Sequence, residues 1–211
     1  MTFSNAVAIA GFLIGAMVTA HPAGAVTFED LEAHMDRSQA ELAKFRSALA
    51  DDNPDRRRAA MEFLLKSDDP VLVRLAKEAG LNSPDIQIQK AALRAILNSS
   101  PRLRLQIKVE GSSGDAAAAW IVRYVDGSVD SKSGFGYILI GDYNSKDGCW
   151  MRRDGHGCHA YLADNILTIA FRNAKVPLTL EENGILLGKV LYENTAPPEK
   201  WQSKALIDLM E

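Results

Sequence analysis

The hydrophobic pattern of the sequence changes near Pro101, and this change constrains the fold more than any other feature. Residues 28–100 are rich in Ala, Leu, Glu, Lys and Arg, and their apolar residues recur at helical spacing. From residue 103 onward apolar and polar residues alternate, and most of the Gly, Tyr and Trp lie in this part. We therefore predict an α+β protein with a helical domain at residues 26–100 and an antiparallel β domain at residues 101–211.

The helical part contains three predicted helix starts. Asn53-Pro54, Asp69-Pro70 and Ser83-Pro84 each pair a capping side chain with proline at the first helical position, where the missing amide proton costs nothing. A preceding helix has one apolar face, made of Leu31, Met35, Leu42, Phe45 and Leu49. We expect this face to be covered by another part of the protein.

Two segments of the helical part, residues 59–67 and 91–99, repeat the same order of apolar positions. Another predicted helix, residues 70–79, lies between them. An alternating helical array with Asp-Pro starts and Ala-Ala-Leu inner faces resembles HEAT-like repeats over about residues 51–100. The alternative is a plain three- or four-helix bundle that reuses Ala-rich packing.

The second part has the pattern of a sheet with one buried face and one solvent-exposed face. Leu103, Leu105, Ile107 and Val109 alternate with polar residues. Further strands are predicted at residues 118–125, 136–143, 166–172, 178–182, 185–192 and 204–209. Asn183-Gly184 is a strong hairpin signal and Asp126-Gly127 a weaker one, because tight turns need positive φ. Short strands at close spacing indicate a β-sandwich or a partly closed barrel.

The first 25 residues are typical of an export signal. Residues 6–20 form an unbroken run of small and apolar residues, and Ala23-Gly24-Ala25 is a candidate cleavage site. The run is shorter than the roughly 20 apolar residues that span a bilayer. We therefore expect cleavage near Val26, no transmembrane segment in the mature chain, and a periplasmic or extracellular location after bacterial export.

The charge of the chain argues against a nucleic-acid partner. The formal net charge is −3, and Lys and Arg are spread along the sequence. Binding to phosphate groups of nucleic acid needs a clustered basic surface. We expect neither a cofactor nor a resident metal ion.

The segment from Cys149 to His159 carries the most distinctive chemistry, and its two cysteines have three interpretations. In an oxidising compartment, two cysteines that flank a Gly-rich turn most simply form a disulfide across a hairpin. Alternatively, Cys149, His156, Cys158 and His159 supply sulfur and nitrogen ligands for zinc, although adjacent residues on a strand point to opposite faces. The third interpretation is a thiol enzyme.

The enzymatic interpretation follows from His156-Gly157-Cys158, which resembles the His-Gly-Cys core of the YkuD-type L,D-transpeptidases, cell-wall enzymes with a mainly β fold. The resemblance implies Cys158 as the nucleophile. In that family an Arg follows shortly after the Cys, whereas His159, Ala160 and Tyr161 stand here. A thiol also needs a positioned base to become a nucleophile, and Cys149 can consume it as a disulfide.

We predict binding rather than catalysis, with a protein or cell-envelope component as the partner. The expected contact regions are the surface of the helical domain and the loop from residue 142 to 159, with Trp150 as an accessible aromatic side chain. The candidate binding residues are Trp150, Arg152, Arg153, Asp154, His156 and His159. Residues 142–148 partly match a calcium loop, but Lys146 occupies an acidic position, so we expect a hydrated turn there.

Overall fold

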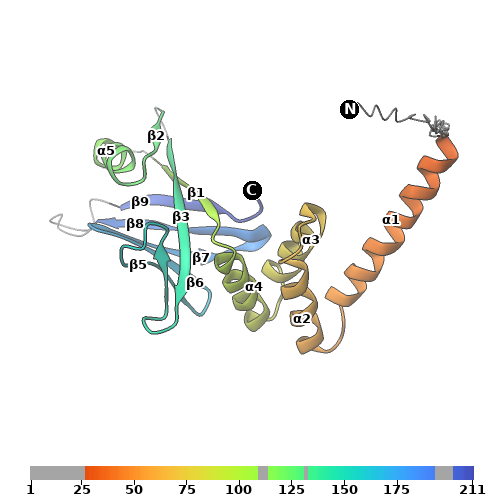
Figure 1. The fold of residues 1–211 in the computed structure, drawn as a ribbon. Helices are drawn as coiled ribbons and strands as arrows, with labels where there is room; N and C mark the ends of the chain where they lie inside the picture. The colour runs from red at the N-terminus through yellow and green to blue at the C-terminus, as the bar shows by residue number, and fades with distance from the viewer. Residues whose placement is uncertain (1–26, 109–113, 131–132, 193–201) are drawn as a thin grey trace, which may run out of the picture. The chain divides into compact units, whose positions relative to one another are not determined.

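The computed structural model describes residues 27–108, 114–130, 133–192 and 202–211. The predicted signal peptide at residues 1–25 lies outside these ranges. The helices are α1 (Phe28–Leu49), α2 (Pro54–Leu64), α3 (Pro70–Leu81), α4 (Ile86–Asn98) and α5 (Gly114–Tyr124), with a 3-10 turn, η2, at Glu182–Gly184 (Figure 1). The strands are β1 (Arg102–Lys108), β2 (Ser128–Val129), β3 (Ser133–Asn144), β4 (Cys149–Arg152), β5 (Cys158–Ala163), β6 (Ile166–Phe171), β7 (Ala174–Leu180), β8 (Ile185–Tyr192) and β9 (Gln202–Asp208).

The chain divides into two compact units, Met1–Gln39 and Ala40–Glu211, and α1 continues from one into the other. In the first unit, Phe28, Leu31 and Met35 are exposed. In the second unit, Phe45 and Leu49 pack against the core. In the described ranges no helix is both long and apolar enough to span a membrane.

Side-chain caps begin the helices of the second unit. Asn53 Oδ1 accepts a hydrogen bond from Asp55 N at 2.9 Å, and Asp69 Oδ1 accepts one from Val71 N at 2.8 Å, so two predicted starts are confirmed. The third is shifted: α4 is capped by Asp85, which accepts from Gln87 N at 2.8 Å. Ser83 instead accepts from Asp85 N at 3.2 Å. A carboxylate is the better cap beside the positive end of the helix dipole.

The β part is a closed antiparallel barrel. Its strand order is β1-β9-β8-β7-β6-β5-β4-β3, and pairing between β1 and β3 closes these eight strands; β2 adds a short pairing to β3. Leu103, Leu105 and Ile107 of β1 are buried, as their alternation predicts. Of the two architectures that the sequence allowed, the barrel is the one found, and it is fully closed.

The strand predicted at residues 118–125 is wrong, because this segment belongs to helix α5. The buried residues here are Ala117, Trp120, Ile121 and Val125. Trp120 and Ile121 follow Ala117 by three and four positions, and Val125 follows Ile121 by four, which is helical spacing. The Asp126-Gly127 hairpin is also wrong. Asp126 has φ 51° and ends the helix, and Gly127 N donates to Ile121 O at 3.3 Å. An aspartate in the left-handed region ends a helix as readily as it forms a turn.

Helix α5 packs against one end of the barrel. Gly136 of β3 leaves room for it, because a Cβ there would lie 2.6 Å from Val125 Cγ1 and 2.7 Å from Val125 O. The Trp120 ring meets the edge of the Phe171 ring at a centroid distance of 4.7 Å, and its Nε1 donates to Asn173 Oδ1 at 3.1 Å. These contacts fix α5 to strand ends that are distant in sequence.

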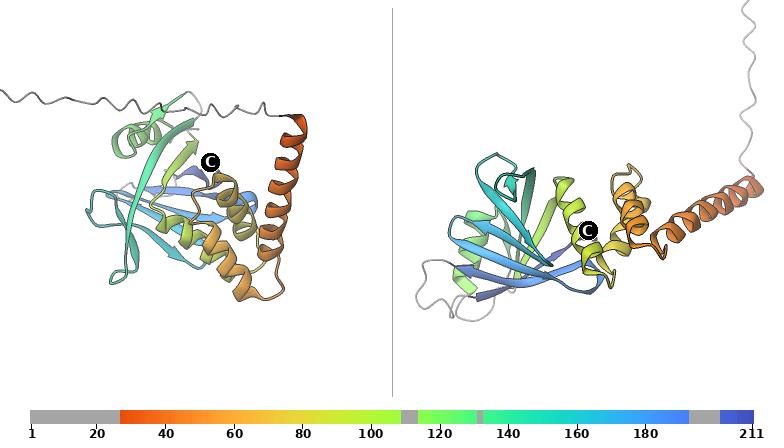
Figure 2. Two further views of the ribbon diagram at one scale, coloured as in Figure 1. Left: turned by 45° about the vertical axis from the view of Figure 1, so that its right-hand side comes forward. Right: turned by 90° about the horizontal axis from the view of Figure 1, so that it is seen from below.

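Helices α3 and α4 pack against the other end of the barrel (Figures 1 and 2). Lys77 Nζ donates to Leu209 O at 2.6 Å, and Asn183 N donates to Asn82 Oδ1 at 2.8 Å. Buried side chains from α2 to β9 form one continuous cluster. The change from helices to strands falls at Pro101, as predicted, while the hydrophobic core continues across it.

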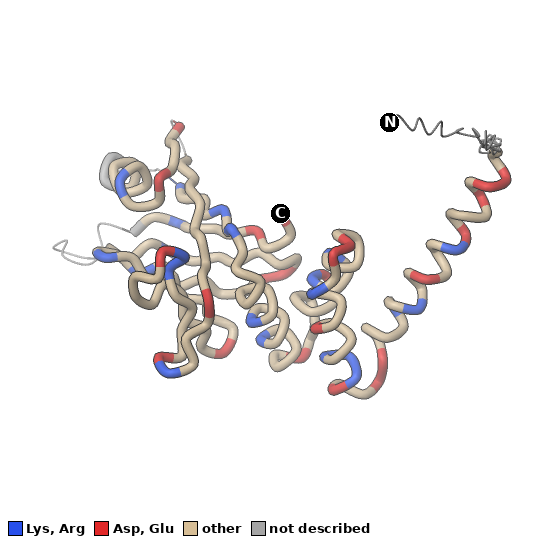
Figure 3. The backbone as a smooth tube through the Cα atoms, viewed as in Figure 1, with Lys and Arg blue, Asp and Glu red and all other residues tan. Residues whose placement is uncertain are grey.

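The predicted Asn183-Gly184 turn is confirmed by its backbone angles. Asn183 has φ 61° and Gly184 has φ 73°, and Glu181 N donates to Ile185 O at 2.8 Å across the turn. The loop contains one residue more than a two-residue hairpin, because Glu182 also lies in it. Figure 3 shows acidic and basic residues interspersed along the helices, which agrees with the dispersed charge of the sequence.

Candidate functional site

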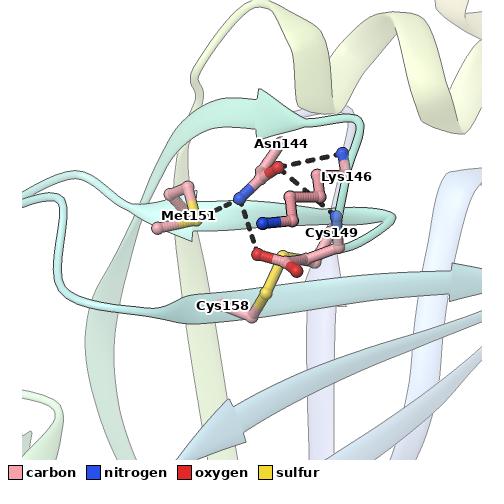
Figure 4. The surroundings of a disulfide bond; sticks show 6 residues. Asn144, Lys146, Cys149, Met151 and Cys158 are labelled. Carbon is pink, nitrogen blue, oxygen red and sulfur yellow. Dashed lines mark hydrogen bonds between the residues drawn. A yellow bond between two sulfur atoms is a disulfide. The ribbon is translucent and has the colours of Figure 1, made fainter.

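A disulfide between Cys149 and Cys158 joins the starts of β4 and β5 (Figure 4). The Cα atoms are 5.7 Å apart, which suits this bond, and Cys149 is fully buried. The predicted pairing is confirmed. Both sulfur atoms are engaged with each other, so Cys158 carries no thiol for the enzymatic interpretation and neither cysteine carries a thiolate for zinc.

The turn before Cys149 is shaped by Asn144. Its Oδ1 accepts hydrogen bonds from Lys146 N at 3.0 Å and Asp147 N at 3.3 Å, and its Nδ2 donates to Asp147 Oδ2 at 2.7 Å and to Met151 Sδ at 3.8 Å (Figure 4). Such an Asx turn needs no bound ion. The interactions hold β3 and β4 in register beside the disulfide.

The prediction that Trp150 is accessible is wrong. Its side chain is 1% exposed, and its ring packs against Tyr143 at a centroid distance of 4.9 Å. The indole Nε1 donates to Asn98 Oδ1 of α4 at 2.9 Å. A buried tryptophan needs a partner for its N–H, and α4 supplies it. Trp150 therefore connects β4 to the helices instead of contacting a ligand.

A cavity of about 210 Å³ lies where the end of α5 meets the barrel wall. On this edge of β3, β2 pairs with Gly134 and Phe135, and β4 pairs from Ile140 onward. Residues of β3 between these pairings face the cavity. Its lining consists of Tyr124, Val125, Asp126, Tyr137, Ile138, Leu139, Arg152, Arg153, Asp154, His159 and Phe171.

Four of the six predicted binding residues line this cavity together: Arg152, Arg153, Asp154 and His159. The other two, Trp150 and His156, do not. The backbone N of His156 instead donates to Asp154 Oδ1 at 3.0 Å and orients that carboxylate. Sequence reasoning missed Tyr124, Asp126, Tyr137 and Phe171, which come from three other segments and carry no local motif.

The charged groups of the cavity differ in how far they are already paired. Arg152 Nη2 lies 3.3 Å from Asp154 Oδ2, and both side chains are about half exposed. The hydrogen bond from His156 N lowers the pKa of Asp154 most, and the charge of Arg152 adds to this effect, so the carboxylate is ionised at neutral pH. Arg153 is exposed and makes no ion pair with the residues that the structure describes. Its guanidinium is the cation available to a ligand.

His159 contributes a neutral imidazole to the wall. It is 5% exposed, its Nδ1 lies 2.8 Å from Ala170 O, and the Phe171 ring meets it edge-on. Burial lowers the pKa of His159, and the hydrogen bond to Ala170 O opposes this effect. A carbonyl oxygen can only accept, so Nδ1 carries the proton and Nε2 of the neutral ring is an acceptor. The cavity thus combines arginine donors with the carboxylates of Asp126 and Asp154 and with one imidazole acceptor.

A larger cavity, about 540 Å³, lies between α2 and α4. It is lined by residues of the two repeated segments: Glu62, Leu65, Lys66, Ala91, Arg94, Ala95, Asn98 and Ser99. The repeat therefore corresponds to two helices that face a common groove. Small and aliphatic side chains form much of its wall, and they give little indication of a particular ligand.

Comparisons with known proteins do not add a functional assignment. Within the described ranges, no group of three or more His, Cys, Asp and Glu side chains is placed to hold a metal ion. No family model, curated protein sequence or solved structure matches this chain significantly.

Proposed function

We propose that this protein is an exported, non-catalytic binding protein that recognises a carboxylate of a protein or cell-envelope partner at the α5 end of its barrel. The observation that carries the proposal is the cavity in which Arg152, Arg153, Asp154 and His159 meet. These residues lie on a loop and strand that the disulfide holds in place. A rigid scaffold that presents a polar loop is typical of recognition sites.

The charge of the lining favours a single carboxylate as the bound group. Arg152 and Arg153 supply two positive charges, and Asp126 and Asp154 supply two negative charges. A dianionic phosphate would meet repulsion from both aspartates, whereas a carboxylate accepts the paired donors of one guanidinium. An N–H or O–H beside that carboxylate would donate to His159 Nε2. A terminal residue of a polypeptide carries both groups.

The size of the cavity favours part of a macromolecule over a complete small ligand. Pockets for whole small molecules usually have about 300 to 1,000 Å³. The cavity here has about 210 Å³ and is flanked by the exposed side chains of Tyr124, Tyr137 and Leu139. One terminal residue or one acidic side chain fits such a volume, while the rest of the partner contacts the rim.

Export is supported by the N-terminal sequence and by the disulfide, because disulfides persist in oxidising compartments. The same bond weakens the rival interpretation of a cell-wall thiol enzyme. A nucleophilic thiolate at Cys158 would require reduction of the bond to Cys149. The resemblance of the helices to HEAT-like repeats stays a prediction.

The direct test uses N-acetylglycine, which has one carboxylate next to one amide N–H. We expect saturable changes in the NMR signals of Arg153, Asp154 and His159 of ¹⁵N-labelled protein at millimolar probe. N-acetylglycinamide has no charge and should leave these signals unchanged. The Arg153→Ala variant should lose the response, because it removes the unpaired cation.

Arg74→Ala is the matched control for this experiment. Arg74 is an exposed arginine on α3 that pairs with Glu78 at 3.0 Å, and it lies outside the residues that line the cavity. This variant also removes one positive charge, but it should bind N-acetylglycine like the wild type. A wild-type protein without saturable changes at the cavity would contradict the proposed function.

A further inference from the structure

A row of stacked arginines lies on the outer face of β1 and β3, next to the cavity. Arg102 lies over the Tyr137 ring with its guanidinium carbon 3.6 Å from the ring centroid, and Arg104 lies over Phe135 at 4.8 Å. Stacking uses the flat face of a guanidinium and leaves its N–H donors at the edge. The two guanidinium groups are thus oriented in advance for planar anions.

Arg104 already holds a carboxylate. Its Nη1 lies 3.2 Å from Oε1 and 3.4 Å from Oε2 of Glu211. Arg104 Nε is buried and has no hydrogen-bond partner among the described residues. The contact with Glu211 demonstrates that carboxylates are compatible with this row. Arg102 is exposed and forms no ion pair within the described ranges, so its donor edge is available.

Tyr137 lies between the two stacked arginines, Arg102 and Arg104, and the proposed carboxylate-binding cavity beside α5. It lines the cavity of about 210 Å³ beside α5, and it also lines a second cavity of about 450 Å³. The second cavity contains both stacked arginines and Lys77, together with Asp208 and Glu211. A ligand that follows the outer face of β3 past Tyr137 can therefore reach Arg153 and Arg102 in turn.

We propose that this surface is one continuous docking track for an extended acidic segment of a partner polypeptide. One carboxylate binds at Arg153, and a second binds at Arg102. The inference rests on the proposed function for the first contact and adds the second contact and the class of partner. The chain as a whole is acidic, with net charge −3, so this arginine row is a local exception to its charge.

A polypeptide fits this surface better than an acidic polysaccharide. Sugar rings usually bind by stacking on free aromatic faces. Here the Tyr137 and Phe135 rings each have an arginine stacked over them. A sugar would have to displace these guanidinium groups, whereas carboxylate side chains bind their edges and leave the stacking intact.

The test compares acetylated peptides with two glutamates separated by about one to six glycines, where each residue adds up to about 3.5 Å of reach. The reference peptides have one glutamate replaced by glutamine. Calorimetric titration should find one spacer length at which affinity rises about tenfold or more over the reference peptide. Arg102→Ala should remove this gain without changing the binding of N-acetylglycine. Arg102→Lys keeps the positive charge but has no planar guanidinium to stack on Tyr137 and bind a carboxylate with two N–H groups, so it should remove most of this gain in affinity.

The outcomes separate the inference from the proposed function. Arg153→Ala should weaken every probe, and Arg74→Ala should weaken none. If N-acetylglycine binds at the cavity but no two-glutamate peptide binds more tightly than its reference, the docking track is refuted and the carboxylate site stands. If polygalacturonate binds more tightly than every peptide and depends on Arg102, the polypeptide assignment is overturned. Absence of N-acetylglycine binding refutes the proposed function itself.

Discussion

The hydrogen bond between Trp150 and Asn98 is the sharpest test of how the helices stabilise the barrel. Asn98 is the last residue of α4, and its Oδ1 accepts from the Trp150 indole at 2.9 Å. Trp150 is 1% exposed, so its indole N–H depends on this amide oxygen for a partner. Asn98→Ala therefore leaves a buried donor unpaired, which costs about 1–3 kcal/mol. Better helix propensity of alanine offsets a few tenths of this, and we expect a net loss of about 1–2 kcal/mol.

Trp150→Phe removes the same hydrogen bond from the other side and also leaves a small cavity. Asn98 is exposed, so water can satisfy its amide once the indole has gone. The loss should be about 2–3 kcal/mol, mainly from the smaller ring and the void it leaves. In the double variant no indole N–H remains to lose its partner, so the cost of Asn98→Ala should disappear. The coupling energy is then about 1 kcal/mol or more.

Urea unfolding of the wild type, the two single variants and the double variant measures this double-mutant cycle. For a protein of this size, each kcal/mol of lost stability also lowers Tm by about 2–4 °C. Gln87→Ala is the control, because Gln87 is an exposed residue of the same helix and should change stability by less than about 0.5 kcal/mol. A loss for Asn98→Ala that is equally large with Phe at position 150 would refute the reasoning, because the cost would then not arise from the indole.

Two further perturbations follow from the same region. Replacing both Cys149 and Cys158 with alanine should lower the free energy of unfolding by about 2.5 kcal/mol, the chain-entropy value for a sequence separation of 9. Urea unfolding midpoints with and without reductant measure this loss. A wild-type protein whose midpoint does not respond to reductant would contradict the disulfide. The pKa of His159 lies below its usual value of 6.5, mainly because the side chain is buried. Below about pH 6.5 the unfolded chain therefore binds more protons than the folded chain, and the free energy of unfolding should fall as the pH falls below this value. His159→Asn keeps a donor for Ala170 O and does not titrate, so its stability should fall less steeply between about pH 6.5 and 5, and an identical slope would contradict the neutral imidazole.

Local sequence patterns predicted much of the fold because they report backbone geometry and one-sided burial. Alternation in β1, the capped starts of α2 and α3, and the positive φ values at Asn183 and Gly184 are all consequences of nearby residues. Helix α5 was misassigned because a short apolar run has the same composition in a buried helix and a buried strand. Its packing depends on Gly136 and on Phe171, which no local window includes.

The candidate site was half predictable for the same reason. The loop chemistry of Arg152, Arg153 and Asp154 is visible in the sequence, because charged residues around glycines indicate an exposed turn. The position of Trp150 is not visible in the sequence. An indole often lies at a boundary with solvent, but here the side-chain oxygen of Asn98 on α4 accepts its N–H inside the protein. Tyr137, which lines this cavity and lies under Arg102, is on β3. It shares the cavity with the loop because β4 ends at Arg152 and leaves this part of β3 unpaired on that edge. The proposed recognition at this end of the barrel thus depends on where β4 ends as much as on which residues the loop contains.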